Sequence, residues 1–400
     1  MAQVFGLRCG LSTQSPPAHT LLMACFKGCI PASCLQLGYF LKMMNRLVKA
    51  GAVKKTPAQV QSIERQSWTE PSADAISTGS KVLWGFWHTG RENLPPFCEL
   101  CVRTWEARHP GWTVVILSDS SFKTYVSPSD LPSTFEGLKV QHRSDIVRFA
   151  VLRRYGGVYM DVSTVCMKSF NDIWENPGDA EVMLAMPGWL DCGTKIVNNA
   201  IIMALKPHTP YIARLQQRVL LYAESPCTTL EEMKGHSAFG EWRRHFDDPG
   251  MGLIADMMEY AAILWIMADC LVYDKEVRCY VEQHVRALPT FTWTHDFLCL
   301  PEPPKDGKDN WQAGFVVKQF WKYAPVLFKD DPKAFKSICD RVNVFKVSTL
   351  FATDWEKPMA WHLGNKTTMG RVLQHASDPA TLMQATLDST YPIPLPNNQL

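Results

Sequence analysis

The stretch RSDIVRFAVLRRYGGVYMDVS, residues 143–163, decides the fold class, because it combines a helix, a glycine stop and a strand. Ser144 is typical of a helix N-cap, and Asp145 falls in the first turn, where its charge favours the helix dipole. Apolar residues then recur along one helical face. Gly156 and Gly157 can take the left-handed conformation that ends a helix, and the β-branched and aromatic residues after them favour a strand.

The strand predicted at residues 158–160 delivers one carboxylate, that of Asp161. Asp is seldom fully buried without a partner, and strand ends in open α/β sheets are where ligands bind. The other interpretation is a helix-to-strand connection in which Asp161 only caps a turn. From the residues alone, both interpretations remain.

Strand and helix patterns alternate around this stretch. Residues 81–88 and 112–117 are β-branched and aromatic runs, and residues 95–108 between them read as a helix. This order predicts an α/β fold with a mostly parallel central sheet and crossover helices. Further elements are expected farther along: strands at 182–186 and 198–204, a helix at 210–222, and a buried helix within 253–273, where acidic residues bracket a nine-residue apolar stretch.

Composition limits the function classes. The chain has 400 residues, of which 46% are hydrophobic and 20% charged, which indicates a globular protein. A net charge of +2 gives no global electrostatic case for nucleic acid as a partner. The 13 cysteines are scattered, and Cys98 and Cys101 lack a second pair or a nearby histidine that would complete a zinc site. We expect free thiols in a reducing compartment.

The predicted domains are an N-terminal extension at 1–80, a main domain at 81–390 and a tail at 391–400. Residues 21–41 are apolar but interrupted, and basic residues follow them. Two outcomes are open: a membrane-associated segment that leaves the main domain facing the cytosol, or a soluble N-terminus and a cytosolic protein. Residues 56–80 are rich in Ser, Thr, Gln and Pro and read as a linker.

The central stretch resembles a known signature: Ser144-Asp145-x-x-Arg148 in a helix, then Tyr-Gly-Gly-Val-Tyr and an acid. It is that of sugar-transferring enzymes in the capsular polysaccharide synthesis and mannosyltransferase-like group, glycosyltransferase family 32. The resemblance covers roughly residues 80–290. Supporting pieces occur in the expected order: a Trp-rich strand ending at Trp87, His109-Pro-Gly-Trp112 before a strand ending in Asp119, and Asn198-Asn199-Ala-Ile-Ile before Lys206-Pro-His-Thr-Pro210.

The resemblance implies a GT-A fold, a Rossmann-like domain that takes a nucleotide-sugar donor and passes the sugar to an acceptor. It also implies retention of the anomeric configuration. Polymer, lipid and small-metabolite acceptors all fit. The near-neutral charge and the 14 tryptophans favour a lipid or an apolar small molecule over an anionic polymer.

Such enzymes place Asp-x-Asp at a strand end, where a divalent cation neutralises the departing diphosphate. By this match Asp161 is the catalytic residue, and its carboxylate either binds Mn²⁺ or Mg²⁺ or binds the ribose. The second acid is Ser163 here, which is a poorer ligand. One carboxylate with diphosphate oxygens still suits Mg²⁺. His362 is a further candidate for binding the metal or the diphosphate, although a lone histidine is more often structural.

The remaining site residues also follow from the resemblance. Asp145 and Arg148 lie one turn apart on one helix face, where they would contact the nucleotide or anchor the acidic loop. Four further residues complete the nucleotide-sugar site: Gly156, Gly157, Tyr159 and Ser163. Asn198 and Asn199 would bond acceptor or donor hydroxyls, or else cap the strand entry. The competing prediction, for which Ser163 is the argument, is a non-catalytic nucleotide- or sugar-binding protein of the same fold.

Overall fold

The structure is a computed structural model, and it describes residues 68–185, 198–247, 258–288, 291–293, 330–341, 344–347, 355–364, 367–378 and 393–394. All of them belong to one compact unit, Ala50–Leu400. The predicted segment at 21–41 and most of the predicted extension lie outside the described residues. No helix in the described ranges is both long and apolar enough to cross a membrane.

A seven-stranded sheet forms the centre of the unit, in the order β10-β7-β5-β6-β3-β1-β2. β1 pairs in parallel with β2 and β3, and β5 pairs in parallel with β7, whereas β6 and β10 run antiparallel to their neighbours. The predicted α/β fold with a mostly parallel sheet is therefore confirmed. The strands are β1 (Val82–Phe86), β2 (Thr113–Leu117), β3 (Gly157–Met160), β5 (Val182–Ala185), β6 (Asn198–Ala204), β7 (Val285–Leu288) and β10 (Ile393–Pro394).

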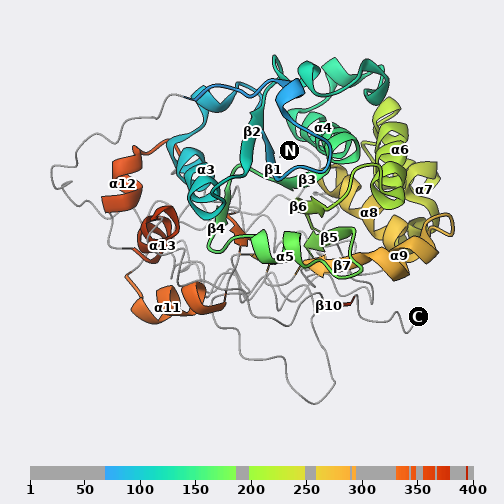
Figure 1. Cartoon of the computed structure of the whole chain (residues 1–400). Coiled ribbons are helices and arrows are strands. Elements are labelled where there is room, and N and C mark those ends of the chain that lie inside the picture. The colour runs from blue at the N-terminus through green and yellow to red at the C-terminus, as the bar shows by residue number, and fades with distance from the viewer. Residues whose placement is uncertain are drawn as a thin grey trace, which may run out of the picture. The chain divides into compact units, whose positions relative to one another are not determined.

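The order of the strands reverses at β1. Helix α3 (Pro96–Arg108) connects β1 to β2 on one side, and helix α4 (Val140–Tyr155) returns from β2 across β1 to β3 on the other. Parallel crossovers are right-handed, so two crossovers in opposite directions put their helices on opposite faces of the sheet. Figure 1 shows α3 and α4 on opposite sides of β1 and β2. The carboxyl ends of β1 and β3 therefore lie at a topological switch point, where open α/β sheets bind their ligands.

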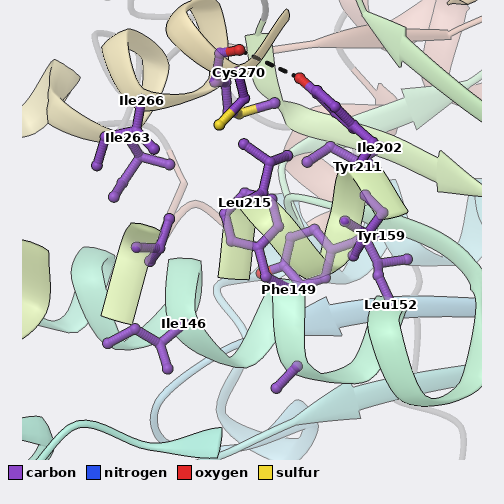
Figure 2. Packing of buried hydrophobic residues seen from close by; sticks show 14 of the residues in the cluster. Ile146, Phe149, Leu152, Tyr159, Ile202, Tyr211, Leu215, Ile263, Ile266 and Cys270 are labelled. Carbon is purple, nitrogen blue, oxygen red and sulfur yellow. Dashed lines mark hydrogen bonds between the residues drawn. The ribbon is translucent and has the colours of Figure 1, made fainter. Parts of the chain in front are cut away.

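The face covered by α4 holds the main core. Helix α6 (Pro210–Glu224) packs beside α4, and helix α8 (Met258–Val272) packs against α6 and β6. Figure 2 shows their apolar side chains meeting those of β3 and β6. The hydroxyl of Tyr211 donates to the carbonyl of Met267 at 3.3 Å, which ties α6 to α8. The labelled core residues are Ile146, Phe149, Leu152, Tyr159, Ile202, Tyr211, Leu215, Ile263, Ile266 and Cys270.

A second, three-stranded sheet has the order β4-β9-β8, with β4 (Thr164–Cys166), β8 (Phe291–Trp293) and β9 (Val344–Lys346). β4 follows β3 after one turn and pairs antiparallel with β9. Helix α3 packs against β4 and against the late helix α13. The small sheet thus brings residues near position 345 next to the end of β3.

The other helices are α5 (Asn171–Glu175), α7 (Leu230–Gly235), α9 (Arg278–His284), α11 (Pro332–Arg341), α12 (Met359–Gly364) and α13 (Thr368–Ser377). Short 3₁₀ segments lie at Ala73–Ala75, Arg91–Asn93, Phe122–Thr124, Pro128–Asp130, Phe135–Gly137 and Ser237–Asp247. The strands and helices predicted at 81–88, 95–108, 112–117, 182–186, 198–204 and 210–222 are each present within a few residues of the expected bounds. The helix expected within 253–273 is α8, and its residues 262–272 are buried.

One local prediction is wrong. Helix α4 begins at Val140, four residues before Ser144, so Ser144 is not its N-cap. The residues before Ser144 are compatible with a helix, and the turn they add places Ser144 inside it. Its hydroxyl lies 2.8 Å from the hydroxyl of Tyr159, on the neighbouring strand β3. The polar side chain that suited a cap therefore pairs with the buried phenol instead.

Candidate functional site

Asp161 comes directly after β3, at the carboxyl end of the parallel strands. Its backbone N–H donates to the carbonyl of Ala200 at 2.8 Å, which continues the β3–β6 ladder by one residue. Its own carbonyl accepts from the N–H of Thr164 at 2.9 Å, which closes the tight turn into β4. The side chain of Asp161 is 22% exposed. A partly exposed carboxylate therefore lies at the switch point of the sheet, and its place directly after a strand is the one that the sequence predicted.

Arg148 joins the two acids of the signature. Its Nη1 donates to Oδ1 of Asp145 at 2.6 Å, and its Nη2 donates to Oδ1 of Asp161 at 2.9 Å. The guanidinium lies over the ring of Tyr159, 4.4 Å from the centroid. Arg148 is only 3% exposed. Asp145 and Arg148 therefore lie on the same face of α4, as predicted. The Arg148 guanidinium is oriented by its two carboxylate partners and by the ring of Tyr159.

Burial and charge act against each other in this cluster. Burial raises the pKa of Asp145 above its usual value, although the nearby Arg148 guanidinium lowers it. Burial alone would lower the pKa of Arg148, but the carboxylate of Asp145 raises it, so the guanidinium stays charged. Burial also raises the pKa of Tyr159, which stays a neutral phenol. The cluster is a buried ion pair with one partly exposed acid at its end.

Strand β6 brings an amide to the same place. Because β6 runs antiparallel to β3, its first residues lie beside the carboxyl end of β3. The Nδ2 of Asn199 donates to Oδ1 of Asp145 at 2.9 Å. Asn198 begins the strand, and its side chain lies outside the described residues. The predicted pair of amides therefore enters the site through Asn199, as a further donor to the buried acid.

Lys346 is a site residue that the sequence reasoning missed. It is the last residue of β9, and the β4–β9 register sets it opposite Thr164, three residues after Asp161. Its Nζ forms an ion pair with Oδ2 of Asp161. The available signal was weak: a lysine that ends the short run Val344-Phe345-Lys346, far beyond the recognisable motif. Only the pairing of two three-residue strands connects it to the acid.

The two glycines lie at the other end of β3. Gly156 has φ 74° and Gly157 has φ 95°, so both need the left-handed conformation that glycine allows. A Cβ on Gly157 would lie 2.7 Å from the carbonyl oxygen of Val82, and the indole of Trp84 donates to the carbonyl of Gly156 at 2.9 Å. The glycines thus let β3 pass close to β1. The structure does not bring them together with Asp161, and they take no part in the function proposed below.

Ser163 and His362 have buried positions. Ser163 is 3% exposed, and its carbonyl accepts from the N–H of Val347 at 2.9 Å, in line with the β4–β9 ladder. His362, on α12, packs its ring 5.2 Å from that of Phe97 on α3 and 5.0 Å from that of Trp361. The predicted metal role of His362 is not tested by these contacts and stays a prediction.

The surroundings of Asp161 are cationic. Within the described ranges, no group of three or more His, Cys, Asp or Glu side chains is arranged to hold a metal ion. One carboxylate oxygen of Asp161 accepts from Arg148 and the other pairs with Lys346. Both oxygens of Asp161 are already paired, so a divalent ion could bind them only by displacing Arg148 or Lys346. This arrangement does not fit such an ion. The need for Mn²⁺ or Mg²⁺ stays a prediction, tested below with a chelator.

Comparison with known proteins gives one family model and several curated relatives that match part of the chain. Residues 46–225 match the family model of the capsular polysaccharide synthesis protein. O-glycosyltransferase braB of Annulohypoxylon truncatum is 33% identical over 153 residues, which are 34% of this chain and 36% of that protein. O-glycosyltransferase PaGT of Phomopsis amygdali is 34% identical over 108 residues, which are 24% of this chain and 26% of that protein. The chain thus spans about a third or less of the length of these curated relatives.

Solved structures give distant matches. The PaToxG glycosyltransferase has a TM-score of 0.28 and 13% identity, over 63% of this chain and 94% of that chain. The galactosyltransferase LgtC, solved in complex with donor and acceptor sugar analogues, has a TM-score of 0.31 and 13% identity, over 77% of this chain and 98% of that chain. On the sequence matches, the resemblance predicted from the Ser-Asp-x-x-Arg motif is confirmed. Over part of its length, the chain is therefore similar in sequence to glycosyltransferases of the capsular polysaccharide synthesis-like group.

Proposed function

We propose that this protein is a glycosyltransferase of GT-A architecture that moves a sugar from a nucleotide-sugar donor to a hydroxyl group of an acceptor. The donor binds at the carboxyl ends of β1 and β3. Two of its curated relatives are O-glycosyltransferases, which supports an oxygen atom as the acceptor nucleophile.

The observation that carries this proposal is the position of Asp161. It is a partly exposed carboxylate at a topological switch point, and two cations hold it in place from opposite oxygens. A carboxylate whose only role was to cap a turn would not need a buried arginine, a second acid and a lysine from a distant strand around it. Ligands of open α/β sheets bind at such a point.

The residues divide into two roles. Asp161 contacts the donor, because its side chain is exposed at the sheet edge. Asp145, Arg148 and Asn199 are positioning residues, because Arg148 and Asp145 are buried and bond to each other rather than to solvent. Of the two roles that the motif implied for Arg148, anchoring the acidic loop is therefore the one that its burial supports.

Composition supports one class of acceptor over another. The near-neutral charge and the many tryptophans support a lipid or an apolar small molecule over an anionic glycan. Retention of the anomeric configuration is proposed from the family resemblance alone. Proton NMR of the product, read at the anomeric coupling constant, distinguishes retention from inversion.

The test uses the full chain with a panel of UDP- and GDP-sugars, with Mn²⁺, with Mg²⁺ and with EDTA, and measures slow donor hydrolysis. We expect hydrolysis of at least one donor by the wild type and its loss in Asp161→Asn. If no donor is hydrolysed, and if the wild type and Asp161→Asn bind nucleotides equally well, the proposal is wrong.

One observation favours a second function. Ser163 stands where the second acid of the motif is expected, and it is buried at 3% exposure. A non-catalytic nucleotide- or sugar-binding protein of the same fold would not need that second acid for its function. It would bind a nucleoside diphosphate at the same edge, Asp161→Asn would weaken that binding, and neither protein would hydrolyse any donor.

A further inference from the structure

We propose that Lys346 binds the diphosphate of the donor and stabilises it as it leaves. Its ammonium group supplies the positive charge that a metal ion held by two carboxylates supplies in related sites. This inference rests on the proposed function and names one residue of that site. The residue lies outside the motif and comes from a different sheet.

Strand pairing places Lys346 next to Asp161. Lys346 meets Asp161 because β9 pairs antiparallel with β4, and β4 follows Asp161 after a single turn. The lysine side chain is 13% exposed and its partner carboxylate is 22% exposed. The ion pair therefore lies at the surface of the carboxyl edge, within reach of a ligand bound to Asp161.

Arg148 and Lys346 differ in their freedom to contact a ligand. Arg148 has one terminal nitrogen on Asp145 and the other on Asp161, is stacked on Tyr159, and is nearly inaccessible. It cannot turn toward a ligand without leaving the buried carboxylate of Asp145 without its cation. Lys346 carries a compact charge with three donors on a flexible stem, so its ammonium can reach a phosphate oxygen while staying near the carboxylate. Of these two cations, the lysine is the one that can contact the donor.

Sugar transfer moves negative charge onto the departing diphosphate. The bond between the anomeric carbon and the β-phosphate oxygen breaks, and both electrons stay on that oxygen. The acceptor hydroxyl oxygen forms the new bond to the anomeric carbon, and its proton passes to the departing diphosphate. Negative charge therefore develops on the phosphate, and a cation already in place there lowers the barrier. Ser163 cannot contribute a second carboxylate to hold a metal ion for this purpose.

The test measures nucleotide binding to the full chain by calorimetry with EDTA present. The probes are UDP and GDP, each compared with its monophosphate, UMP or GMP. The variants are Lys346→Met, which removes the charge, and Lys346→Arg, which keeps it. The matched control is Lys336→Met, because Lys336 forms an ion pair with Asp340 on the exposed surface of α11.

We expect the wild type to bind a diphosphate without a divalent ion. Lys346→Met should bind that diphosphate roughly 10- to 100-fold more weakly, with the monophosphate affinity unchanged, since charged hydrogen bonds to phosphate contribute on this scale. Lys346→Arg should recover most of the loss, and Lys336→Met should match the wild type.

Three results would overturn the inference. Lys346→Met could bind the diphosphate as tightly as the wild type, or it could lose the same fraction of its affinity for the monophosphate as for the diphosphate. The third result is a wild type that binds the diphosphate only when Mn²⁺ or Mg²⁺ is added. Each of these leaves the proposed function standing, because a nucleotide still binds. If the wild type binds no nucleotide under any condition, the proposed function fails together with the inference.

Discussion

The Nη2 of Arg148 lies 2.9 Å from Oδ1 of Asp161, and this contact ties helix α4 to the end of the strand that follows it. The same guanidinium holds Asp145 through its other terminal nitrogen at 2.6 Å. The side-chain orientation of Asp161 is therefore fixed by this contact. That orientation depends on the buried ion pair between Arg148 and Asp145.

Asp161→Asn should abolish most of the activity while leaving the fold intact. The amide keeps the shape of the side chain but loses the charge that pairs with Arg148 and Lys346. We expect donor hydrolysis to fall by roughly 100-fold or more, as is typical when a group that stabilises a charged transition state is removed. The matched control is Asp172→Asn on the exposed side of α5, which should keep full activity. Equal activity in both variants would contradict the prediction.

Arg148→Met should destabilise the protein as a whole. It leaves the buried carboxylate of Asp145 without its cation, and breaking a buried pair in this way costs about 3–5 kcal/mol. Urea unfolding of the wild type and the variant measures the difference.

Arg154→Met provides the control for that measurement. Arg154 lies on the same helix but is exposed, so we expect a change of at most about 0.5 kcal/mol. Arg148→Lys should not restore stability fully, because a lysine lacks the fork that bonds two carboxylates at once. Full recovery by lysine would argue against the two-sided contact.

His109 should make stability depend on pH. Burial lowers its pKa to about 4, and its Nε2 accepts from the N–H of Phe170 at 3.0 Å, which requires the neutral ring. The unfolded chain binds a proton near its usual pKa of about 6.5. The folded state therefore keeps this stability fully above about pH 6.5 and loses it as the pH falls toward about 4, by at most about 3 kcal/mol.

The measurement compares urea unfolding at pH 7.5 and pH 5 for the wild type and for His109→Gln. The variant lacks the titrating ring, so its stability should fall less between the two pH values. His208→Asn, in an exposed turn, is the control and should follow the wild type. A wild type and a His109→Gln variant with the same pH dependence would rule out the buried imidazole as the cause.

Gly157→Ala tests whether the paired glycines serve the fold or the ligand. The new Cβ would lie 2.7 Å from the Val82 carbonyl oxygen, at a φ of 95° that alanine disfavours. We expect a loss of stability of about 1–3 kcal/mol. In the fraction that folds, nucleotide affinity should equal that of the wild type.

Gly137→Ala is the matched control, because a Cβ there would meet nothing within 4 Å. Its stability should stay within about 0.5 kcal/mol of the wild type or rise slightly. If Gly157→Ala folds with unchanged stability but loses nucleotide binding, the glycine has the ligand role that the motif implied and not the structural one.

Much of the fold could be predicted because its signals are local. The strand at 82–86, the helix at 96–108 and the strand at 198–204 follow from runs of a few residues whose propensity and spacing agree with the final structure. The start of α4 could not be predicted from Ser144, because a cap signal gives no information about whether the residues before it also join the helix.

The sequence by itself determined that one acid, Asp161, follows a strand, and that Asp145 and Arg148 share a helix face, since these relations depend only on spacing within twenty residues. Tertiary structure decided which partners meet that acid. Asn199 reaches Asp145 across 54 positions, and Lys346 reaches Asp161 across 185. Both contacts depend on the register of antiparallel strand pairs, and register is set by long-range packing that no local pattern contains.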